Sequence, residues 1–445
     1  MEKIEKKIPL AAITEGAFPQ LNLITFKLNE LADGVSVLRV VTPMNLASEK
    51  ETWMMYASSH NFYYVPDFKY NTDYLKSVVS KRADIEKILA EVNNINAYDE
   101  VDRFMIRLMK QRIYDLLLTI GIAEGILAKD DDRSMEYIVQ KYGLIDPNGA
   151  LAVSAHEVAA KMVEEAGQPE ANKKIKFLQE LRFGPDKIVK VFKKVLEIYN
   201  EFTQQKTGKE FGAAILSNEV TAITVCENEG DGIVIKIPEN HRLVDGLELS
   251  KLVKHEIECH VRDSFNGREL LRGLCGGKLH SEQGILREGH AMLKEAKLVK
   301  QLGGKMEIPK PFYTIAIVEA LNKVPIEDIA IDMFERMLVL ENQNKQRALE
   351  RTWTILYRTL FRGRSDFQSK NYIFLKDKCY FEGYFIARQC DNRLPGRWLE
   401  TGVFSVKEFE MFNKHVELPE SNHLLVKDLK IAEKIPDLLA KGQTL

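Results

Sequence analysis

The stretch VKHEIECHVRDSFNG, residues 253–267, carries two histidines, His255 and His260, with Glu256 directly after the first. The best-known zinc protease signature, H-E-x-x-H, has its histidines four residues apart, whereas these two are five apart. Each residue of an α-helix advances by about 100°, so side chains five apart point about 140° away from each other. A one-residue π-bulge restores a shared face, and such bulges are frequent at functional sites. The spacing therefore indicates either a distorted helix at a metal site or an ordinary helix that carries two histidines.

The residues before this stretch predict a pair of strands. Residues 222–226 and 232–237 are rich in β-branched and apolar side chains, and the turn at residues 229–232, Glu-Gly-Asp-Gly, contains two glycines. This is the signal of a hairpin. Residues 250–261 then place apolar side chains at helical spacing, with Ser250 as the expected N-cap. A strand pair that leads into such a helix is typical of zincin-type metalloproteases, in which a sheet edge can hold an extended peptide beside the metal.

A second group of polar residues lies in SEQGILREGHAML, residues 281–293, which we expect to be helical. Catalytic zinc usually has three protein ligands, and a carboxylate from a following helix is the standard third ligand beside two histidines. We favour Glu288, because Gly289 next to it lets a backbone or a ligand come close. Glu282 is the alternative, although its place near the helix start also suits a carboxylate that complements the helix dipole. His290 is expected to face elsewhere.

Glu256 is the expected general base of such a site. It cannot easily point in the same direction as His255, yet it can reach a water molecule bound to zinc. Zinc lowers the pKa of this water toward about 7, and a carboxylate then accepts its proton as the water attacks a carbonyl group. We therefore expect Zn²⁺ as the cofactor, although imidazole and carboxylate suit several divalent ions. Cys259 offers a thiolate ligand, but a small buried thiol is its more common role.

The composition excludes several other classes of protein. The chain has 445 residues and a formal net charge of -2, from 63 basic and 65 acidic residues. This balance gives no reason to expect binding to nucleic acid or to an anionic membrane surface. The chain has no apolar run of about 18 residues, so no membrane span is expected. Its first residues do not resemble a signal peptide. Five scattered cysteines without a C-x-x-C motif suit reduced thiols, so we expect a cytoplasmic protein.

The pattern of the whole chain predicts an α+β fold that is mainly helical, with a small mixed β-sheet and a zincin-like metallopeptidase core. Apolar residues three and four apart predict helices through most of the first half. Residues 130–143, DDDRSMEYIVQKYG, are expected to form a capped helix that ends at Gly143. The acidic residues of KDDDR, 129–133, are interpreted as a solvated helix cap. We expect residues 1–205 to form a helical portion packed on a catalytic portion, residues 206–445, as one compact unit.

These motifs resemble those of a known family, the microtubule-associated tyrosine carboxypeptidases and their bacterial homologues with a Q-E-G-L-C motif. The family pattern H-E-I-G-x-H-V followed by N-G is similar to HEIECHV with Asn266-Gly267. LREGHAM, residues 286–292, lies where Q-E-G-L is expected, so the resemblance places Glu288 on the family's glutamate ligand. The other similar segments are VTPMNLASEKETW (41–53), GIVIKIPEN (232–240) and LFRGRSDFQSKNYIFLKDKCYFEGY (360–384), so that the likeness covers about residues 40–410.

The resemblance implies a zinc-dependent carboxypeptidase that removes the last residue, tyrosine in characterised members, from the C-terminus of a peptide or protein. This chain departs from the family pattern at four positions near the motifs. Glu258 replaces a glycine between the histidines, Arg287 and His290 replace glutamine and leucine around the E-G pair, and Leu375 replaces threonine. The long polar extensions of the animal members have no counterpart here, so microtubule binding is not implied.

A carboxypeptidase also needs a cation for the terminal carboxylate of its substrate, and the planar fork of arginine suits this task. The candidates are Arg362 and Lys376, together with Arg287 and Arg262, which are nearer to the ligands in sequence. Tyr380 is a candidate donor to the oxyanion that forms during hydrolysis. The ordinary alternative is a solvated or ion-paired residue for each cation, and a core residue for the tyrosine.

Two other functions remain open at this point. Dipeptidyl peptidases of the third type are aminopeptidases that also use H-E-x-x-x-H, but their second motif, E-E-x-R, differs from Glu288-Gly289. The other alternative is a metal-binding regulatory protein without turnover. Glu258 keeps this alternative open, because a second acid near the site can occupy the water position or raise the pKa of Glu256.

Overall fold

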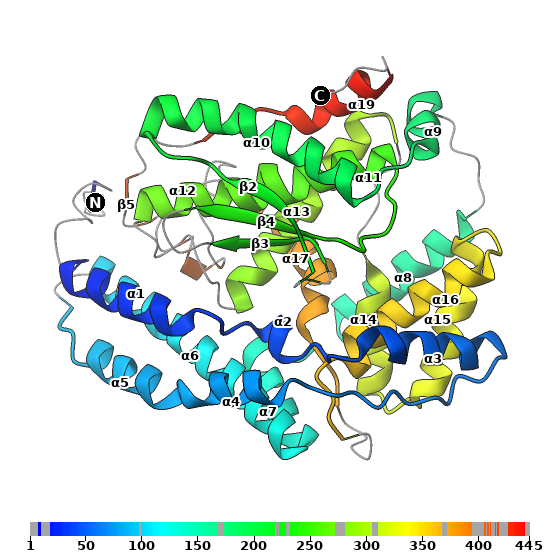
Figure 1. Ribbon diagram of the computed structural model, residues 1–445, viewed down its shortest axis with the longest axis horizontal. Helices are drawn as coiled ribbons and strands as arrows, with labels where there is room; N and C mark the ends of the chain where they lie inside the picture. Colours follow the sequence, from blue (N-terminus) through cyan, green and yellow to red (C-terminus); the bar gives the residue numbers. More distant parts are fainter. Residues whose placement is uncertain are drawn as a thin grey trace, which may run out of the picture.

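The computed structural model describes residues 8–9, 18–97, 100–166, 172–218, 220, 222–227, 232–271, 281–304, 310–366, 372–393, 405, 407–408, 410, 414, 416–417 and 426–440. These residues form a mainly helical α+β structure with a small mixed sheet, which confirms this part of the predicted fold class. Figure 1 shows the sheet and the helices around it in the upper half of the molecule, and a larger set of helices in the lower half.

The helices of the lower half are α1 (Phe18–Ala32), α2 (Val37–Val40), α3 (Leu46–Ser58), α4 (Thr72–Ser80), α5 (Arg82–Asn93), α6 (Glu100–Ala128), α7 (Asp131–Tyr142), α8 (Ala150–Glu164), α14 (Pro311–Leu321), α15 (Ile326–Leu340) and α16 (Lys345–Leu356). The upper half contains α9 (Lys173–Glu180), α10 (Pro185–Thr207), α11 (Gly246–Leu252), α12 (Arg262–Leu271), α13 (Ser281–Gln301) and α19 (Ile431–Ala440). The other described helices include the π-helix η3 (Tyr357–Phe361), the short 3₁₀-helix η4 (Lys376–Lys378) and α17 (Cys379–Arg393).

The sheet has the order β2-β4-β3, with β2 (Ala213–Ser217) parallel and β3 (Thr224–Glu227) antiparallel to the central strand β4 (Ile233–Pro238). The predicted hairpin is therefore confirmed as the pair β3 and β4. Strand β2 was not predicted from the sequence. A second, two-stranded parallel sheet pairs β1 (Ile8–Pro9) with β5 (Val416–Glu417).

The helix after the sheet begins earlier than predicted. Asp245 is the N-cap of α11, and its side chain accepts a hydrogen bond from the backbone of Glu248. Ser250 lies inside α11, where its hydroxyl donates to the carbonyl of Gly246 four residues back. The predicted N-cap at Ser250 is therefore wrong. An aspartate with a glutamate three residues later is the stronger helix start, because it satisfies a free backbone N–H and complements the dipole.

The apolar face of the next element, the π-helix η2 (Val253–Val261), packs in the same hydrophobic cluster as the sheet. Val253, Ile257 and Val261 are fully buried there with Ile235 of the central strand. Full burial of such side chains stabilises a fold by about 1.5–3 kcal/mol each. The sheet therefore fixes one side of the helix that carries the two histidines.

The hydrophobic clusters interleave distant parts of the chain. One cluster joins buried residues between 21 and 159 with others between 312 and 381. A second joins residues between 175 and 302 with residues between 426 and 435. The two predicted portions, residues 1–205 and 206–445, each contribute to both clusters.

Helix α7 follows its prediction at both ends. The side chain of Asp130 caps the start by accepting a hydrogen bond from the backbone of Arg133, and the helix ends at Gly143, whose φ is 70°. The interpretation of the neighbouring acids as solvated is wrong for Asp131. Its buried carboxylate accepts hydrogen bonds from the backbone N–H and the hydroxyl of Ser365, at 2.7 and 2.8 Å. Its partner comes from a distant segment that local sequence does not reveal.

Helices α13 and α17 touch through their backbones. A Cβ atom built on Gly289 would lie 1.9 Å from the carbonyl oxygen of Gly383, and one built on Gly383 would lie 2.1 Å from that of Ile285. Both distances are far below any van der Waals contact, so only glycine allows this crossing. The prediction that Gly289 lets another backbone come close is confirmed, and that backbone belongs to α17.

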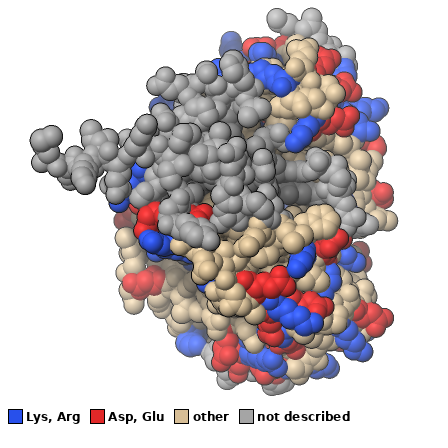
Figure 2. Space-filling model, turned by 90° about the vertical axis from the view of Figure 1, so that its left-hand side faces the viewer, with Lys and Arg blue, Asp and Glu red and all other residues tan. Residues whose placement is uncertain are grey.

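No helix in the described ranges combines the length and apolar character that a membrane span requires. Figure 2 shows the left-hand face of Figure 1, where acidic and basic side chains of the described residues are interspersed. This distribution agrees with the near-zero net charge of the chain.

We expect Gly289→Ala to lower the free energy of unfolding by about 3 kcal/mol, the upper range for an overpacked core, because the new methyl group collides with a backbone. Gly284→Ala on the same helix is the matched control, since no described atom outside its own helix backbone and its chain neighbours lies within 4 Å of the position that its new methyl group would take. That change should stabilise the helix by about 0.5–1 kcal/mol. Urea unfolding measures both, and equal stability of the two variants would contradict the backbone contact.

Candidate metal centre

The helix that carries the two histidines is a π-helix over Val253–Val261, between α11 and α12. The hydrogen bonds of a π-helix run between residues five apart, so such residues stack on one side of the helix. The rings of His255 and His260 accordingly lie with their centroids 4.5 Å apart and their planes at 88°. The predicted distortion is confirmed, and it extends over nine residues rather than a single bulge.

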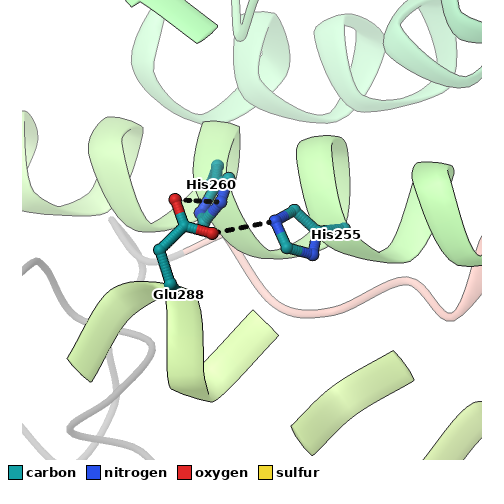
Figure 3. A group of neighbouring side chains, drawn as sticks. All are labelled: His255, His260 and Glu288. Carbon is teal, nitrogen blue, oxygen red and sulfur yellow. Dashed lines mark ion pairs between the residues drawn. The ribbon is translucent and has the colours of Figure 1, made fainter. Parts of the chain in front are cut away.

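Glu288 of α13 faces both rings (Figure 3). Its two carboxylate oxygens lie 3.4 Å from Nε2 of His255 and 3.6 Å from Nε2 of His260. Ligand atoms about 2.1 Å from one tetrahedral zinc ion lie about 3.4 Å from one another. The three side chains therefore have the spacing that a shared metal ion requires, and all their ligand atoms lie within 4.8 Å.

His255 is held from its other side by a second carboxylate. Its Nδ1 lies 2.5 Å from Oε1 of Glu295, which is seven residues after Glu288 and so on the same side of α13. Burial lowers the pKa of His255, but the hydrogen bonds with Glu288 and Glu295 outweigh it and raise the pKa to about 10. The surrounding carboxylates thus favour a positive charge at this ring, which a proton or a metal ion can supply. A carboxylate behind a ligating histidine is a regular feature of metal sites.

Arg287 holds the second histidine. Its Nε donates to Nδ1 of His260 at 3.0 Å, and its Nη2 donates to the carbonyl of His260 at 2.9 Å and to the hydroxyl of Ser264 at 3.0 Å. Burial and the charge of Arg287 lower the pKa of His260 to about 4, which keeps the ring uncharged. Arg287, a predicted substrate-binding residue, is therefore engaged with a ligand.

Glu256 lies beside the three ligands without belonging to their group. Its side chain is half-buried, and burial raises its pKa to about 7. The positive charge of His255 opposes this rise and the negative charge of Glu288 adds to it. A carboxylate with a pKa near neutrality is well suited to accept and return a proton.

The sequence did not single out Arg358, which lies in the π-helix η3. Its guanidinium donates to both oxygens of the buried Asp377, with Nη2 at 2.9 Å from Oδ1. The same Nη2 donates to the hydroxyl of Tyr380 at 3.0 Å, and Nη1 donates to that of Tyr313 at 3.3 Å. These partners are 19, 22 and 45 residues away in sequence, so no local pattern indicates the cluster.

Tyr380, the predicted oxyanion donor, lies near the ligands. It is one helical turn before Gly383, at the point where α17 crosses α13 beside Glu288. Burial raises the pKa of Tyr380 well above its usual value, and the negative charge of Glu288 adds to the rise. Arg358 donates to the tyrosine oxygen, so the hydroxyl hydrogen is available to another acceptor.

The other predicted cations have structural partners. The buried guanidinium of Arg362 lies 3.5 Å from the hydroxyl of Thr42 and over the rings of Tyr357 and Phe374. Lys376 lies 3.9 Å from Asp377. Among the described residues, neither Arg362 nor Lys376 contacts the group of His255, His260 and Glu288. Arg262 is fully buried, 3.5 Å from Asp263 and 3.7 Å from Asp428.

Glu258 points away from the ligands, toward the C-terminal helix. Its Oε1 accepts hydrogen bonds from the backbone N–H groups of Ile431, at 2.5 Å, and Ala432, at 3.3 Å, in the first turn of α19. Its Oε2 lies 2.9 Å from the ammonium of Lys254. The expectation that Glu258 adds an acid to the metal site is therefore wrong. It anchors α19 to the opposite side of the π-helix.

Asp428 and Glu433 join Glu258 in a second group of three acids with metal-like spacing. The ammonium of Lys254 lies among them, 2.7 Å from Asp428, 3.0 Å from Glu433 and 2.9 Å from Glu258. This lysine supplies the positive charge that the three carboxylates require, so we assign the group a structural role.

Three further candidates remain, of which only Cys259 and His290 have described side chains. Glu282, the alternative ligand, lies in the first turn of α13, but its side chain is outside the described residues. Cys259 is buried and is not part of the ligand group. His290 is buried with its Nδ1 3.6 Å from Asp263.

No protein-family model matches the chain, and no curated protein shows a significant match to it. A function is therefore inferred from the geometry of the site and from the sequence motifs.

We expect Glu295→Gln to weaken zinc binding about 10-fold or more, because loss of a carboxylate behind a ligating histidine typically costs 10- to 100-fold in affinity. Competition with a chromogenic chelator measures the change. Glu335→Gln, at an exposed position of α15, is the matched control and should bind zinc like the unchanged protein. Equal affinity of the two variants would show that Glu295 does not support His255.

Proposed function

We propose that this protein is a zinc-dependent metallopeptidase with a zincin-like core that acts as a carboxypeptidase on the C-terminus of a peptide or protein. The observation that carries the proposal is the convergence of His255, His260 and Glu288 on one point, with Glu256 beside it. The resemblance of the same motifs to the tyrosine carboxypeptidase family supports the choice of C-terminal cleavage and of an aromatic last residue.

The side chains of the site have separate tasks in hydrolysis. A zinc ion, when bound, polarises the substrate carbonyl group and makes water more acidic. Glu256 accepts a proton as the water oxygen forms a bond to the carbonyl carbon, and returns it to the amine nitrogen as the C–N bond breaks. Tyr380, fixed by Arg358, donates its hydroxyl hydrogen toward the negative charge that develops on the carbonyl oxygen.

The placement of Glu258 weakens the case for a silent metal-binding protein. That case depended on an acid near the water position, whereas Glu258 is bound to the backbone of α19. Cleavage from the N-terminus, as in dipeptidyl peptidases of the third type, is the alternative that experiment must separate. The proposal includes a cytoplasmic location, which the buried thiols of Cys259 and Cys379 support.

We expect the purified protein to contain about one zinc ion per chain, since three protein ligands are the usual catalytic set. His260→Ala should lose this metal, because two ligands hold zinc much less strongly than three. His156→Ala, on the distant helix α8, is the control and should keep it. Elemental mass spectrometry measures the content. Protein that stays metal-free when zinc is supplied would overturn the proposed site.

We expect Glu256→Gln to lower kcat by at least about 100-fold while zinc stays bound, because a general base contributes this much or more. In the unchanged protein, kcat/KM should rise with pH through about 7, since the active form is the ionised carboxylate of Glu256. Peptide libraries with varied C-termini serve as substrates. Release of N-terminal fragments would favour the aminopeptidase alternative, and loss of zinc in the variant would make Glu256 a ligand.

A further inference from the structure

Two tyrosine rings near the metal centre are flanked by two cations. The rings of Tyr313 and Tyr380 have their centroids 6.3 Å apart. The guanidinium of Arg358 lies 4.9 Å from the first centroid and 5.3 Å from the second. The ammonium of Lys310 lies 4.0 Å from the centroid of Tyr380. Such cation–π contacts hold a cation at an aromatic surface without neutralising its charge.

The two cations differ in whether they form an ion pair with a carboxylate. Arg358 is paired with the buried carboxylate of Asp377. Lys310 is exposed and has no carboxylate within ion-pair distance among the residues that the structure describes. It is the N-cap residue of α14, and its φ is 49°. Among the described residues, the tyrosine pair therefore carries one positive charge that has no ion-pair partner.

This charge lies close to the metal ligands. Tyr380, whose ring Lys310 covers, is beside Glu288 at the crossing of α13 and α17. Burial raises the pKa of Glu295, but its hydrogen bond with His255 and the positive charges of His255, Lys251 and Lys310 outweigh this and lower it. The ammonium of Lys310 is thus near Glu295, which contacts His255. It is also near Tyr380, which lies beside Glu288.

Three of the four cations that the sequence suggested contact other groups, and the fourth, Lys376, lies 3.9 Å from Asp377. Arg287 binds His260, Arg362 binds Thr42, and Arg262 is buried between two aspartates. A carboxypeptidase needs a cation about one residue, or roughly 3.5 Å of extended chain, beyond the carbonyl group that is attacked. An aminopeptidase needs an acid at the matching position for the substrate ammonium. Lys310 supplies a cation rather than an acid, at the ring of Tyr380.

We propose that Lys310, held on the ring of Tyr380, binds the free α-carboxylate of the substrate and so restricts cleavage to the last peptide bond. This inference rests on the proposed function and adds the residue that selects the substrate end. A lysine ammonium has three donors, so it can contact a ring with one side and a carboxylate with another. The chemical class that it selects is a peptide with an ionised C-terminus.

The test uses the full chain with zinc and the Glu256→Gln change, which permits binding without cleavage. The probes are two short peptides that end in tyrosine, one with a free carboxylate and one with a C-terminal amide. Calorimetry should show about 10-fold or stronger binding of the free acid, the usual effect of a hydrogen bond between charged groups. Adding Lys310→Gln should abolish this preference. Adding Lys310→Arg should retain most of it, because the positive charge remains.

Lys300→Gln, at an exposed position of α13, is the matched control and should keep the preference. Equal binding of acid and amide by the parent protein, or an unchanged preference after Lys310→Gln, would overturn the inference. Zinc content and peptide cleavage are measured on the protein with Glu256 intact. If zinc and cleavage are present, either of these binding results overturns only the role of Lys310, and the proposed function stands. If both are absent, the proposed function and the inference fall together.

Discussion

The site depends on the backbone hydrogen bonds of the π-helix between Val253 and Val261. An α-helix of the same sequence would point His255 and His260 to different sides, and no single ion would reach both. The wider turn is supported on two sides. The sheet packs against Val253, Ile257 and Val261, while the C-terminal helix binds the carboxylate of Glu258. A π-helix has less regular packing than an α-helix, so these outside contacts stabilise an arrangement that its own residues favour weakly.

The second constraint is the contact of two glycines. Gly289 and Gly383 let α13 and α17 approach until their backbones touch. Glu288 precedes the first glycine, and Tyr380 lies one turn before the second. The sequence Glu288-Gly289 and the sequence YFEG at residues 380–383, which are distant in the chain, therefore meet at one helix crossing. This crossing brings the carboxylate of Glu288 near Tyr380.

Features with local causes could be predicted from the sequence. The hairpin, the caps of α7, the distortion between the histidines and the preference for Glu288 each depend on residues close together in the chain. The errors and omissions have distant partners. Glu258 binds a residue 173 positions away and Asp131 one 234 positions away. Glu295 lies 40 residues from His255, although its seven-residue spacing from Glu288 was a usable signal. Arg358 and Lys310 have no comparable local pattern.

The anchoring of α19 by Glu258 also bears on the order in which the molecule is made. Ile431 leaves the ribosome 173 residues after Glu258, an interval of about 9–35 s at about 5–20 residues per second. During that time the histidine helix has neither its C-terminal partner nor the carboxylates of Asp428 and Glu433 around Lys254. The π-helical turn is then without one of its two supports. Under the proposed function, loading of the metal is therefore expected to follow translation, because newly made chains pass through a stage in which both histidines are synthesised before this support is in place.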